Sequence, residues 1–289
     1  MCSIVARALA DVKPGQQTAR MQVVKLHDTD DPRLADYRLL TDAVARRKIE
    51  GDELFVAEGP TAIERLIASG HRVRSLLIAD RKFERLRPML EAIDAAVYVV
   101  DAATLQGIVG FDLHRGALAA AERRPVMTLA DVLAHAARVA VLEGLNDPEN
   151  LGAVARSARA FGIDALVIDP TCIDPYTRRT VRVSMGEILH LPWCRAGHSE
   201  WPNATFAQLH ASGFESWALT PSGDHDIWSL DVPDKLALVL GSEGPGLMPA
   251  TLRVAQRQVR LPIEPDVDSL NVGAAAAVAF AVARHTKSV

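Results

Sequence analysis

Cysteine and aromatic residues are scarce in this chain of 289 residues, which contains three cysteines and 5% aromatic residues. The cysteines, at positions 2, 172 and 194, are too few to build a disulfide framework. No CxxC pair is present and the histidines lack the spacing of metal ligands, so we expect no metal site. Disulfide-rich secreted domains and zinc-binding domains are therefore excluded.

Long hydrophobic runs are also lacking. The longest, Val272 to Ala283, has 12 residues, whereas a helix that crosses a bilayer needs roughly 20. The first 20 residues contain no long apolar segment and no convincing cleavage site, which argues against a signal peptide. The sequence therefore predicts a cytoplasmic protein with no membrane partner.

There is no basic excess either, because 32 Lys and Arg residues stand against 36 Asp and Glu residues, giving a net charge of −4. This excludes a strongly basic nucleic-acid-binding chain but leaves room for a local basic face. The 49% of hydrophobic and 24% of charged residues are typical of a globular protein, so a disordered chain is excluded. The length fits one large domain or two ordinary ones.

The first half of the chain alternates between strand and helix patterns. Residues 1–24 show no sustained period and are interpreted as a mobile extension. A helix is predicted over 31–48, with Asp31 as its N-cap before a proline. Further on, the patterns predict strands at 54–59, 73–79, 96–100 and 116–121, and helices at 60–69, 83–93 and 101–108. This alternation favours a small α/β sandwich over residues 25–125.

Charge and a proline at 122–125 interrupt this pattern, and 126–137 is interpreted as a linker with a short helix. The second half, 138–289, then restarts as an α/β domain. Its patterns predict strands at 138–145, 165–168, 214–219, 236–240 and 258–261, and helices at 150–161 and 271–284.

Three segments of the second half place glycine and polar residues where predicted strands end, which is where open α/β sheets bind ligands. In the first, Asn146 and Asn150 bracket a turn, and Asn150 is expected to cap the next helix. Gly152 leaves room for a close approach, and Arg156 follows one turn later. A capped amphipathic helix with a solvated arginine is the alternative reading.

The second segment, LGSEGPG at 240–246, has no Walker lysine, so a phosphate-binding P-loop is not expected. Its glycines free the backbone to wrap a small ligand, and a tight surface turn is the alternative. In the third segment Ser269 is expected to cap the last helix. Gly273 and the alanines after it allow another helix to come very close.

In this order and spacing, the three segments resemble the motifs of the SpoU (TrmH) family of RNA ribose 2′-O-methyltransferases, in the SPOUT superfamily. The matching pieces are Asn146-x-Pro148-x-Asn150-x-Gly152-Ala153-x-x-Arg156, Leu240-Gly241-x-Glu243-Gly244-x-Gly246, and Leu261-Pro262 leading to Ser269-Leu270-Asn271-Val272. Residues 181–193 resemble an intermediate segment of the family. The N-terminal part resembles its attached RNA-binding domain, which has the fold of kink-turn-binding ribosomal proteins. The resemblance covers about residues 30–286.

The resemblance implies a C-terminal α/β trefoil-knot domain that transfers a methyl group from S-adenosyl-L-methionine to a ribose 2′-hydroxyl. It also implies a homodimer formed through the catalytic domain, with the last helix at the interface. Carried over by position, the cofactor contacts fall at Thr220, Gly241, Gly246, Leu261, Ile263 and Leu270.

The catalytic residues implied by the resemblance are Arg156, Asn150, Glu243, Ser269 and Asn271. A guanidinium hardly ever deprotonates, so we expect Arg156 to stabilise the developing alkoxide or to bind the adjacent phosphate. Asn150 is expected to orient Arg156 or the ribose, and Glu243 to fix the arginine or its loop. Many family members have a serine where this chain has Gly273, so no role is carried over for that hydroxyl.

RNA contacts need local positive charge, for which Arg178, Arg179 and Arg182 are the preferred cluster and residues 46–48 a second one. Ribosomal RNA is favoured as the substrate because of the attached N-terminal domain. A tRNA methyltransferase and a non-catalytic RNA-binding protein of the same fold are the alternatives. An α/β hydrolase would need a Walker lysine, a G-x-S-x-G elbow or a metal cluster, and none is present.

Overall fold

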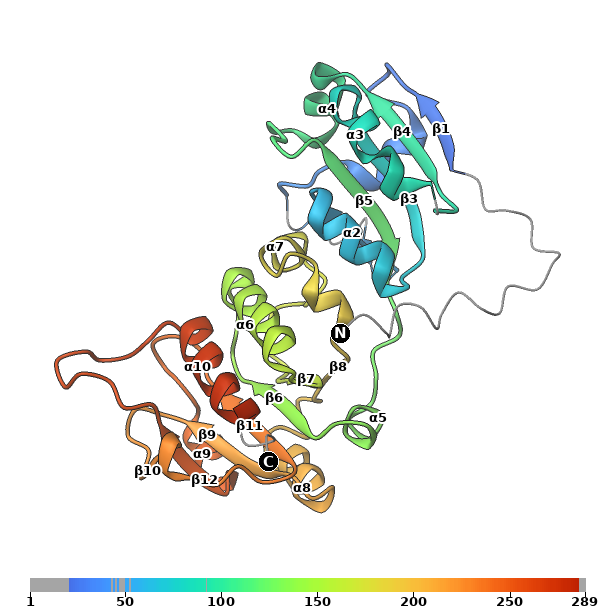
Figure 1. Ribbon diagram of the computed structural model, residues 1–289. Helices are drawn as coiled ribbons and strands as arrows, with labels where there is room; N and C mark the ends of the chain where they lie inside the picture. Colours follow the sequence, from blue (N-terminus) through green and yellow to red (C-terminus); the bar gives the residue numbers. More distant parts are fainter. Residues whose placement is uncertain are drawn as a thin grey trace.

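The computed structural model describes residues 21–285 except 43, 45, 47–49, 52 and 92. Most of the predicted extension, and Arg47 and Lys48 of the second basic cluster, therefore lie outside the described residues. The described chain forms two sheets, one from each half of the sequence, that lie end to end (Figure 1). None of its helices is long and apolar enough to cross a membrane.

The N-terminal sheet has five strands in the order β1-β4-β3-β5-β2. They are β1 (Gln22–Lys25), β2 (Leu54–Glu58), β3 (Val73–Ala79), β4 (Ala96–Val100) and β5 (Ala117–Glu122). β5 runs antiparallel to β2 and β3, and the other pairs are parallel. Helices pack on both faces, which explains why β2, β3 and β5 are almost continuously apolar.

Helices α2 (Pro60–Ser69) and α3 (Asp80–Leu90) cover one face of this sheet. The other face is covered by the 3-10 helix η2 (Pro32–Tyr37) and by α4 (Ala102–Val109). The predicted strands and the helices at 60–69, 83–93 and 101–108 are confirmed, with shifts of a few residues at their ends.

Two predictions for the first half were wrong in extent. The extension does not reach residue 24, because Gln22–Lys25 pairs with β4 as an edge strand too short to show a hydrophobic period. Asp31 does cap the next helix, accepting from the Arg33 amide at 3.0 Å. That helix is a 3-10 helix which ends at Tyr37, and Leu39 then has a left-handed backbone with φ of 54°.

The C-terminal sheet has seven strands in the order β10-β12-β9-β11-β6-β7-β8, and every neighbouring pair is parallel. The strands are β6 (Arg138–Leu142), β7 (Ala165–Ile168), β8 (Trp193–Arg195), β9 (Glu215–Leu219), β10 (His225–Asp226), β11 (Leu236–Leu240) and β12 (Arg257–Arg260). The five predicted strands are confirmed. β8 and β10 were missed because two or three residues carry no readable alternation.

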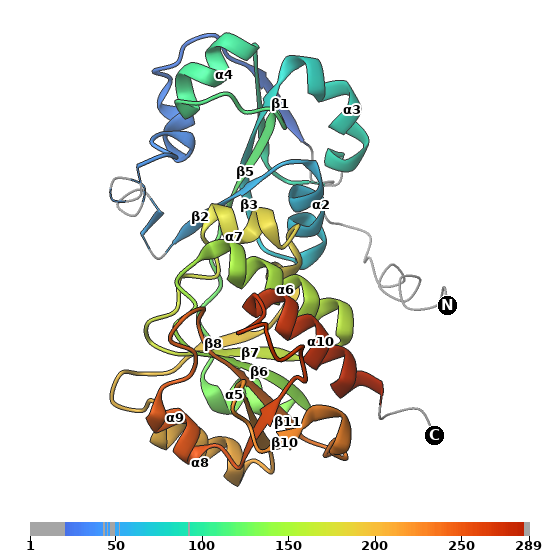
Figure 2. The same cartoon turned by 90° about the vertical axis from the view of Figure 1, so that its left-hand side faces the viewer.

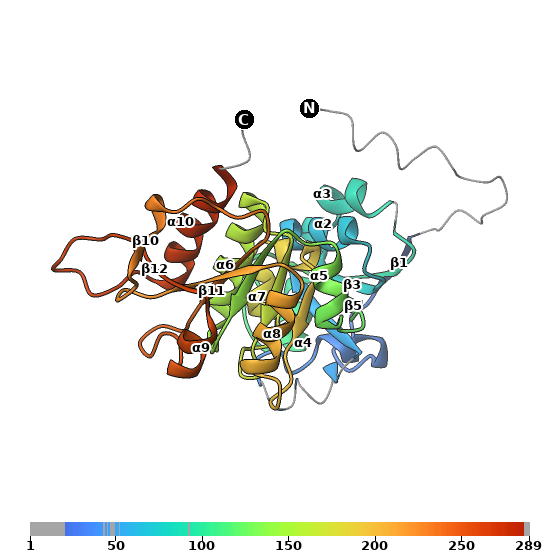
Figure 3. The ribbon, with the colours of Figure 1, turned by 90° about the horizontal axis from the view of Figure 1, so that it is seen from below.

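Helices cover both faces of this sheet as well (Figure 3). On one face lie α6 (Pro148–Phe161), α7 (Arg178–Val183), the 3-10 helix η3 (Glu187–His190) and α10 (Val272–His285). On the other face lie α5 (Leu129–Ala134), α8 (Asn203–Ala211) and α9 (Pro249–Val254). A short 3-10 helix, η4 (Ile227–Ser229), follows β10.

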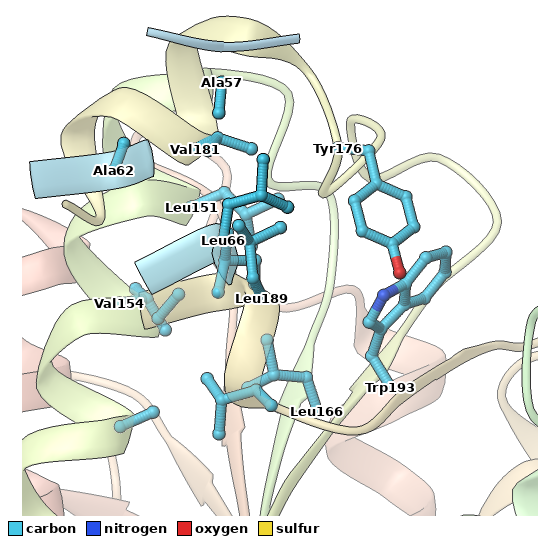
Figure 4. Packing of buried hydrophobic residues seen from close by; sticks show 14 of the residues in the cluster. Ala57, Ala62, Leu66, Leu151, Val154, Leu166, Tyr176, Val181, Leu189 and Trp193 are labelled. Carbon is cyan, nitrogen blue, oxygen red and sulfur yellow. The ribbon is translucent and has the colours of Figure 1, made fainter. Parts of the chain in front are cut away.

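The two halves share one hydrophobic core. Ala57 in β2 and Leu66 in α2 belong to the same buried cluster as Leu151 in α6, Val181 in α7 and Leu189 in η3 (Figure 4). Figure 2 shows α7 between β2 and α6, and it contacts both. Because this cluster is continuous, the halves are packed together and not simply tethered.

Polar contacts surround this shared core. Glu58, at the end of β2, is buried and accepts hydrogen bonds from Arg178 and Arg182 of α7. Elsewhere along the contact, Arg65 pairs with Glu187 at 2.8 Å, Arg123 pairs with Asp174 at 2.6 Å, and His71 Nε2 lies 3.1 Å from the Tyr176 hydroxyl.

Gly152 gives a test of the contact between α6 and α7. A Cβ at this position would lie 2.7 Å from Val183 Cβ. Helix propensity alone predicts that Gly152→Ala stabilises the protein by up to about 1 kcal/mol. We expect instead that the free energy of unfolding falls by about 1–3 kcal/mol, because the extra methyl overpacks the contact. Urea unfolding decides by its sign, and a more stable variant would contradict the close packing.

His71 makes the contact between the halves sensitive to pH. Burial, with smaller effects of Arg124 and His190, lowers the pKa of His71 from 6.5 to about 4. As the pH falls below 6.5, His71 takes up a proton in the unfolded chain before it does so in the folded protein. The free energy of unfolding therefore falls between pH 6.5 and 4, and His71 does not affect it above pH 6.5. Between pH 7 and 4.5 we expect wild type to lose about 1–3 kcal/mol more than His71→Gln. Equal losses in urea unfolding would show that His71 is not the titrating group.

Candidate active site

Three loops meet at the carboxyl edge of the C-terminal sheet. They follow β6 (143–147), β11 (241–248) and β12 (261–271), and β11 lies between β6 and β9 in the sheet. In a parallel sheet the carboxyl ends of neighbouring strands are adjacent, which brings together residues distant in sequence. These loops carry the three motifs found in the sequence, so the structure places them in one site.

The side chain of Asn271 links all three motifs. Its Nδ2 donates to Asn150 Oδ1 at 3.0 Å and to Glu243 Oε1. Its Oδ1 accepts from the amides of Gly273, at 2.9 Å, and Ala274, at 3.3 Å. A side-chain amide has two donor hydrogens and two acceptor lone pairs, and here all four are used. Asn271 therefore fixes the first turn of α6 and the β11 loop relative to the start of α10.

For both helices of this site, α6 and α10, the predicted N-cap residue was wrong. α6 begins at Pro148, and its N-cap is Asp147, which accepts from the Glu149 amide at 2.8 Å. Asn150 lies inside the first turn of α6, which leaves its oxygen available to Asn271. The cap of α10 is Asn271 and not Ser269, because its oxygen binds the first free amides of that helix.

A cavity of about 320 Å³ opens between the β11 and β12 loops. Glu243 and Ser269 line it, as do all six residues expected to contact a cofactor: Thr220, Gly241, Gly246, Leu261, Ile263 and Leu270. Sequence reasoning missed Pro221, Leu252 and Ala275, which also line it. They come from the end of β9, from α9 and from α10, and nothing in their local sequence marks them as cavity residues.

The glycines of the β11 loop are required by its backbone. A Cβ at Gly241 would lie 2.3 Å from the carbonyl carbon of Gly246, because the loop closes on itself through a bridge between Ser242 and Gly246. Gly244 and Gly246 have φ of +80° and +68°, which disfavour other residues. The two interpretations of this segment, as a tight turn and as a ligand site, are therefore compatible, because the turn forms part of the cavity wall.

Arg156 lies on α6 with an exposed side chain. Among the described residues no hydrogen bond or ion pair holds it, so of the roles expected for Asn150 and Glu243 the structure does not show a bond to Arg156. Glu243 binds Asn271 instead and so fixes the loop. The guanidinium of Arg156 is therefore open to solvent.

The arginines of α7 are placed differently from our expectation of a free basic face. Arg178 and Arg182 pair with Glu58, and Arg178 also lies over the Phe111 ring at 5.0 Å. Burial lowers the pKa of Arg178. Arg179 pairs with Glu149, and its side chain is 56% exposed. Their sequence spacing gave no sign of Glu58, which lies in the other half of the chain.

Gly273 lies where α10 crosses α6. A Cβ at this position would lie 2.9 Å from Ala153 Cβ and 3.1 Å from Asn271 Oδ1. The close approach expected of the small residues in this helix is thus made by α6. In this chain a side chain at 273 would also crowd the asparagine that joins the motifs.

The fold and the site define an α/β protein with a ligand cavity at the carboxyl edge of a parallel sheet. A family model, the SpoU rRNA Methylase family, matches residues 137–281, half of the chain. A protein of Mycobacterium bovis named as an uncharacterized tRNA/rRNA methyltransferase is 41% identical over 265 residues, which cover 90% of this chain and 91% of the relative. The chain belongs to the SpoU rRNA methylase family, a family of RNA methyltransferases, and the resemblance seen in the sequence is confirmed.

Two further comparisons extend over most of the chain. RlmB of Ralstonia nicotianae, by name a 23S rRNA (guanosine-2′-O-)-methyltransferase, is 28% identical over 218 residues, which cover 73% of this chain and 86% of RlmB. The crystal structure of an S-adenosylmethionine-bound rRNA methyltransferase from Sinorhizobium meliloti has a TM-score of 0.77 at 25% identity. That likeness covers 93% of this chain and all of the other, so both halves share its fold.

Asn271 can be tested by separating its two roles. Asn271→Asp keeps an oxygen that caps α10 but loses both donors and places a carboxylate beside Glu243. We expect the free energy of unfolding at pH 7 to fall by about 1–3 kcal/mol. Adding Glu243→Gln removes the repulsion and supplies a donor, so the double variant should regain part of the loss. If urea unfolding shows Asn271→Asp as stable as wild type, the linking role is wrong.

Proposed function

We propose that this protein transfers a methyl group from S-adenosyl-L-methionine to a ribose 2′-hydroxyl of structured RNA, with ribosomal RNA as the favoured substrate. The observation that carries the proposal is the junction made by Asn271. Asn271 binds Glu243, which lies in the wall of a cavity suited to a nucleoside cofactor. It also binds Asn150, on the helix that carries the exposed Arg156. Family membership gives the methyl-transfer chemistry.

The cavity fits the cofactor of this family. Leucine and isoleucine side chains and the glycine backbone form most of its walls, and Glu243 and Ser269 supply polar groups. Apolar walls with a few polar groups are typical of sites for a flat, aromatic ligand such as adenine. Bound there, the cofactor supplies a methyl group on a positively charged sulfur. Because the Gly241–Gly246 turn is closed by its own backbone, this wall is formed before any ligand enters.

Within this site the chain must orient the ribose and stabilise the charge that develops on its 2′-oxygen. Arg156 is suited to the second task, because its guanidinium stays charged and has no partner among the described residues. In this role it donates charge-assisted hydrogen bonds to the 2′-oxygen or to the neighbouring phosphate. Asn150 and Glu243 act through Asn271, as positioning residues that hold the loops in register.

The RNA class is proposed from two observations. The name of RlmB specifies 23S rRNA and a guanosine 2′-oxygen, whereas the name of the Mycobacterium bovis relative covers both tRNA and rRNA. The likeness to the Sinorhizobium meliloti rRNA methyltransferase extends over the N-terminal half as well. We therefore place RNA binding in residues 25–125 and catalysis in residues 138–289, with tRNA as the second candidate substrate.

The proposal also includes a trefoil knot and a homodimer. After β12 the chain returns past the β11 loop, with which it shares the cavity, before α10 packs on α6. That path supports a threaded loop. Val267, in the loop before α10, is 45% exposed, which supports a further copy of the chain covering this region.

Methyl transfer can be measured with radiolabelled S-adenosyl-L-methionine and separate unmodified transcripts of 23S rRNA and of tRNA. Nuclease digestion and nucleoside analysis then locate the label. Label in a 2′-O-methylated nucleoside of one RNA supports the reaction and its substrate together. Label on a base would overturn the reaction, and cofactor binding without any label would favour a non-catalytic RNA-binding protein.

The role of Arg156 predicts a separation of binding from turnover. Arg156→Ala should lower methyl transfer at least about a hundredfold, because the developing negative charge loses its donor. The dissociation constant of the cofactor, measured by calorimetry, should stay within about twofold, because the arginine does not line the cavity. Arg159→Ala is the matched control, since Arg159 is paired with Glu187 at 3.8 Å. Normal turnover of Arg156→Ala would refute the assignment.

A further inference from the structure

A second cavity, of about 650 Å³, lies at the junction of the two halves. Arg46 and Arg123 line it from the N-terminal half, and Arg178, Arg179 and Arg195 from the C-terminal half. Its only acidic lining residues in the described part of the chain are Glu50 and Asp174. A cavity lined by five arginines is unexpected in a chain whose net charge is −4.

Most of these arginines already have carboxylate partners. Arg46 pairs with Glu50 at 2.7 Å and Arg123 pairs with Asp174. Arg178 pairs with Glu58 and Arg179 with Glu149. The lining therefore comes close to charge balance except for one residue, Arg195 at the end of β8.

Arg195 forms no ion pair within the part of the chain that the structure describes. Its Nη1 donates to the carbonyl of Cys172 at 2.7 Å and its Nη2 to that of Ile173 at 3.3 Å. Main-chain carbonyls orient a guanidinium but do not neutralise its charge. The cavity thus retains a net positive charge.

A second guanidinium group points to a missing acceptor. Arg46 is only 7% exposed, and its Nη2 has no hydrogen-bond partner among the described residues. A buried donor without an acceptor costs free energy that an anion in the cavity would recover. An anionic group with several oxygens in this cavity would balance the charge of Arg195, and the unpartnered donor of Arg46 belongs to a residue of the same lining.

The cavity is connected to the active site through α6. Arg179 of the lining pairs with Glu149, which precedes Asn150, and Asn150 binds Asn271. An anion in the cavity is therefore separated from the motif junction by a short chain of contacts. RNA that presents a ribose to Arg156 has phosphates on both sides of that ribose, which suits such an arrangement.

We propose that this junction cavity binds a phosphate group of the RNA backbone and so helps to hold the substrate across the two halves. The inference rests on the proposed function for RNA as the ligand. Arg195 supplies the uncompensated charge, and the half-exposed guanidinium of Arg179 is the further donor in the lining that solvent can reach. Free phosphate has the same chemistry, so the test must distinguish it from RNA.

Val126 allows a test that leaves the arginines intact. It lines the cavity and is 56% exposed, so polar substitutions there should not disturb the core. Val126→Glu places a carboxylate where the phosphate would bind, and Val126→Gln matches it in size without charge. In filter binding to an unmodified 23S rRNA transcript and a tRNA transcript, we expect Val126→Glu to bind its preferred RNA about three- to tenfold more weakly than Val126→Gln at about 50 mM salt. The difference should vanish near about 500 mM salt.

Val23 gives the matched control. It is 40% exposed on β1, at the sheet edge opposite β2, so Val23→Glu adds the same charge away from the junction. Its affinity for RNA should stay close to that of Val23→Gln. An equal loss at both positions would mean that only net charge matters, and equal affinities of Val126→Glu and Val126→Gln would overturn the proposal.

Arg195→Met provides the second measurement. Loss of one phosphate contact should reduce the slope of log affinity against log salt by about one. Cofactor binding by calorimetry reports whether the variant is folded. If inorganic phosphate binds in a manner that depends on Arg195 while RNA affinity is unchanged in Arg195→Met and Val126→Glu, the site takes free phosphate and the RNA proposal is wrong.

Failure of the cavity proposal can be distinguished from failure of the proposed function. RNA binding that depends on Val126 and Arg195, without methyl label in any RNA, would retain the cavity and reject the reaction. If the wild-type protein transfers methyl groups but the substitutions at Val126 and Arg195 leave RNA affinity unchanged, the reaction is retained and the cavity proposal is rejected.

Discussion

One side-chain amide fixes the geometry on which the site depends. Asn271 caps α10 with its oxygen and joins the first turn of α6 to the β11 loop with its nitrogen. Since both donors and both lone pairs are used, no other residue type can replace all four bonds. The neighbouring positions follow from this constraint. Asn150 must keep a free acceptor, so Asp147 caps α6, and residue 273 must be small because Ala153 and Asn271 crowd it.

The contact between the halves is built from charge as well as from apolar surface. Glu58 is buried at the end of β2, so its charge requires partners, and Arg178 and Arg182 supply them from α7. These arginines hold the first sheet against the helix that packs on α6. The orientation of the N-terminal half is thereby linked to the helix that carries Arg156, which suits the proposed binding of RNA across both halves.

Much of this fold could be predicted from the sequence, because β6 and β11 are uninterrupted apolar runs followed by glycine and polar residues. The cavity residues followed from the family resemblance, and all six line the cavity. The caps could not be predicted, since Asp147 and Asn150, like Ser269 and Asn271, are all capping residue types and only the backbone decides between them. Strands β8 and β10 are too short to show a period. The ion-pair partner of Arg178 is Glu58, which is 120 positions away in the sequence, so no local pattern could identify it.

This protein and RNA both carry a net negative charge, so the distribution of ion pairs determines where RNA phosphates can bind. An arginine already paired with a carboxylate offers little net attraction to phosphate, because binding must first break the existing pair. By this criterion Arg178 and Arg182 serve the contact between the halves, although their spacing in the sequence suggested an RNA face. Arg156 and Arg195 differ from them in having no carboxylate partner among the described residues. Arg156 lies on α6 and Arg195 at the end of β8, so at each of these two places the proposed RNA path offers a guanidinium that phosphate can approach without first breaking an ion pair.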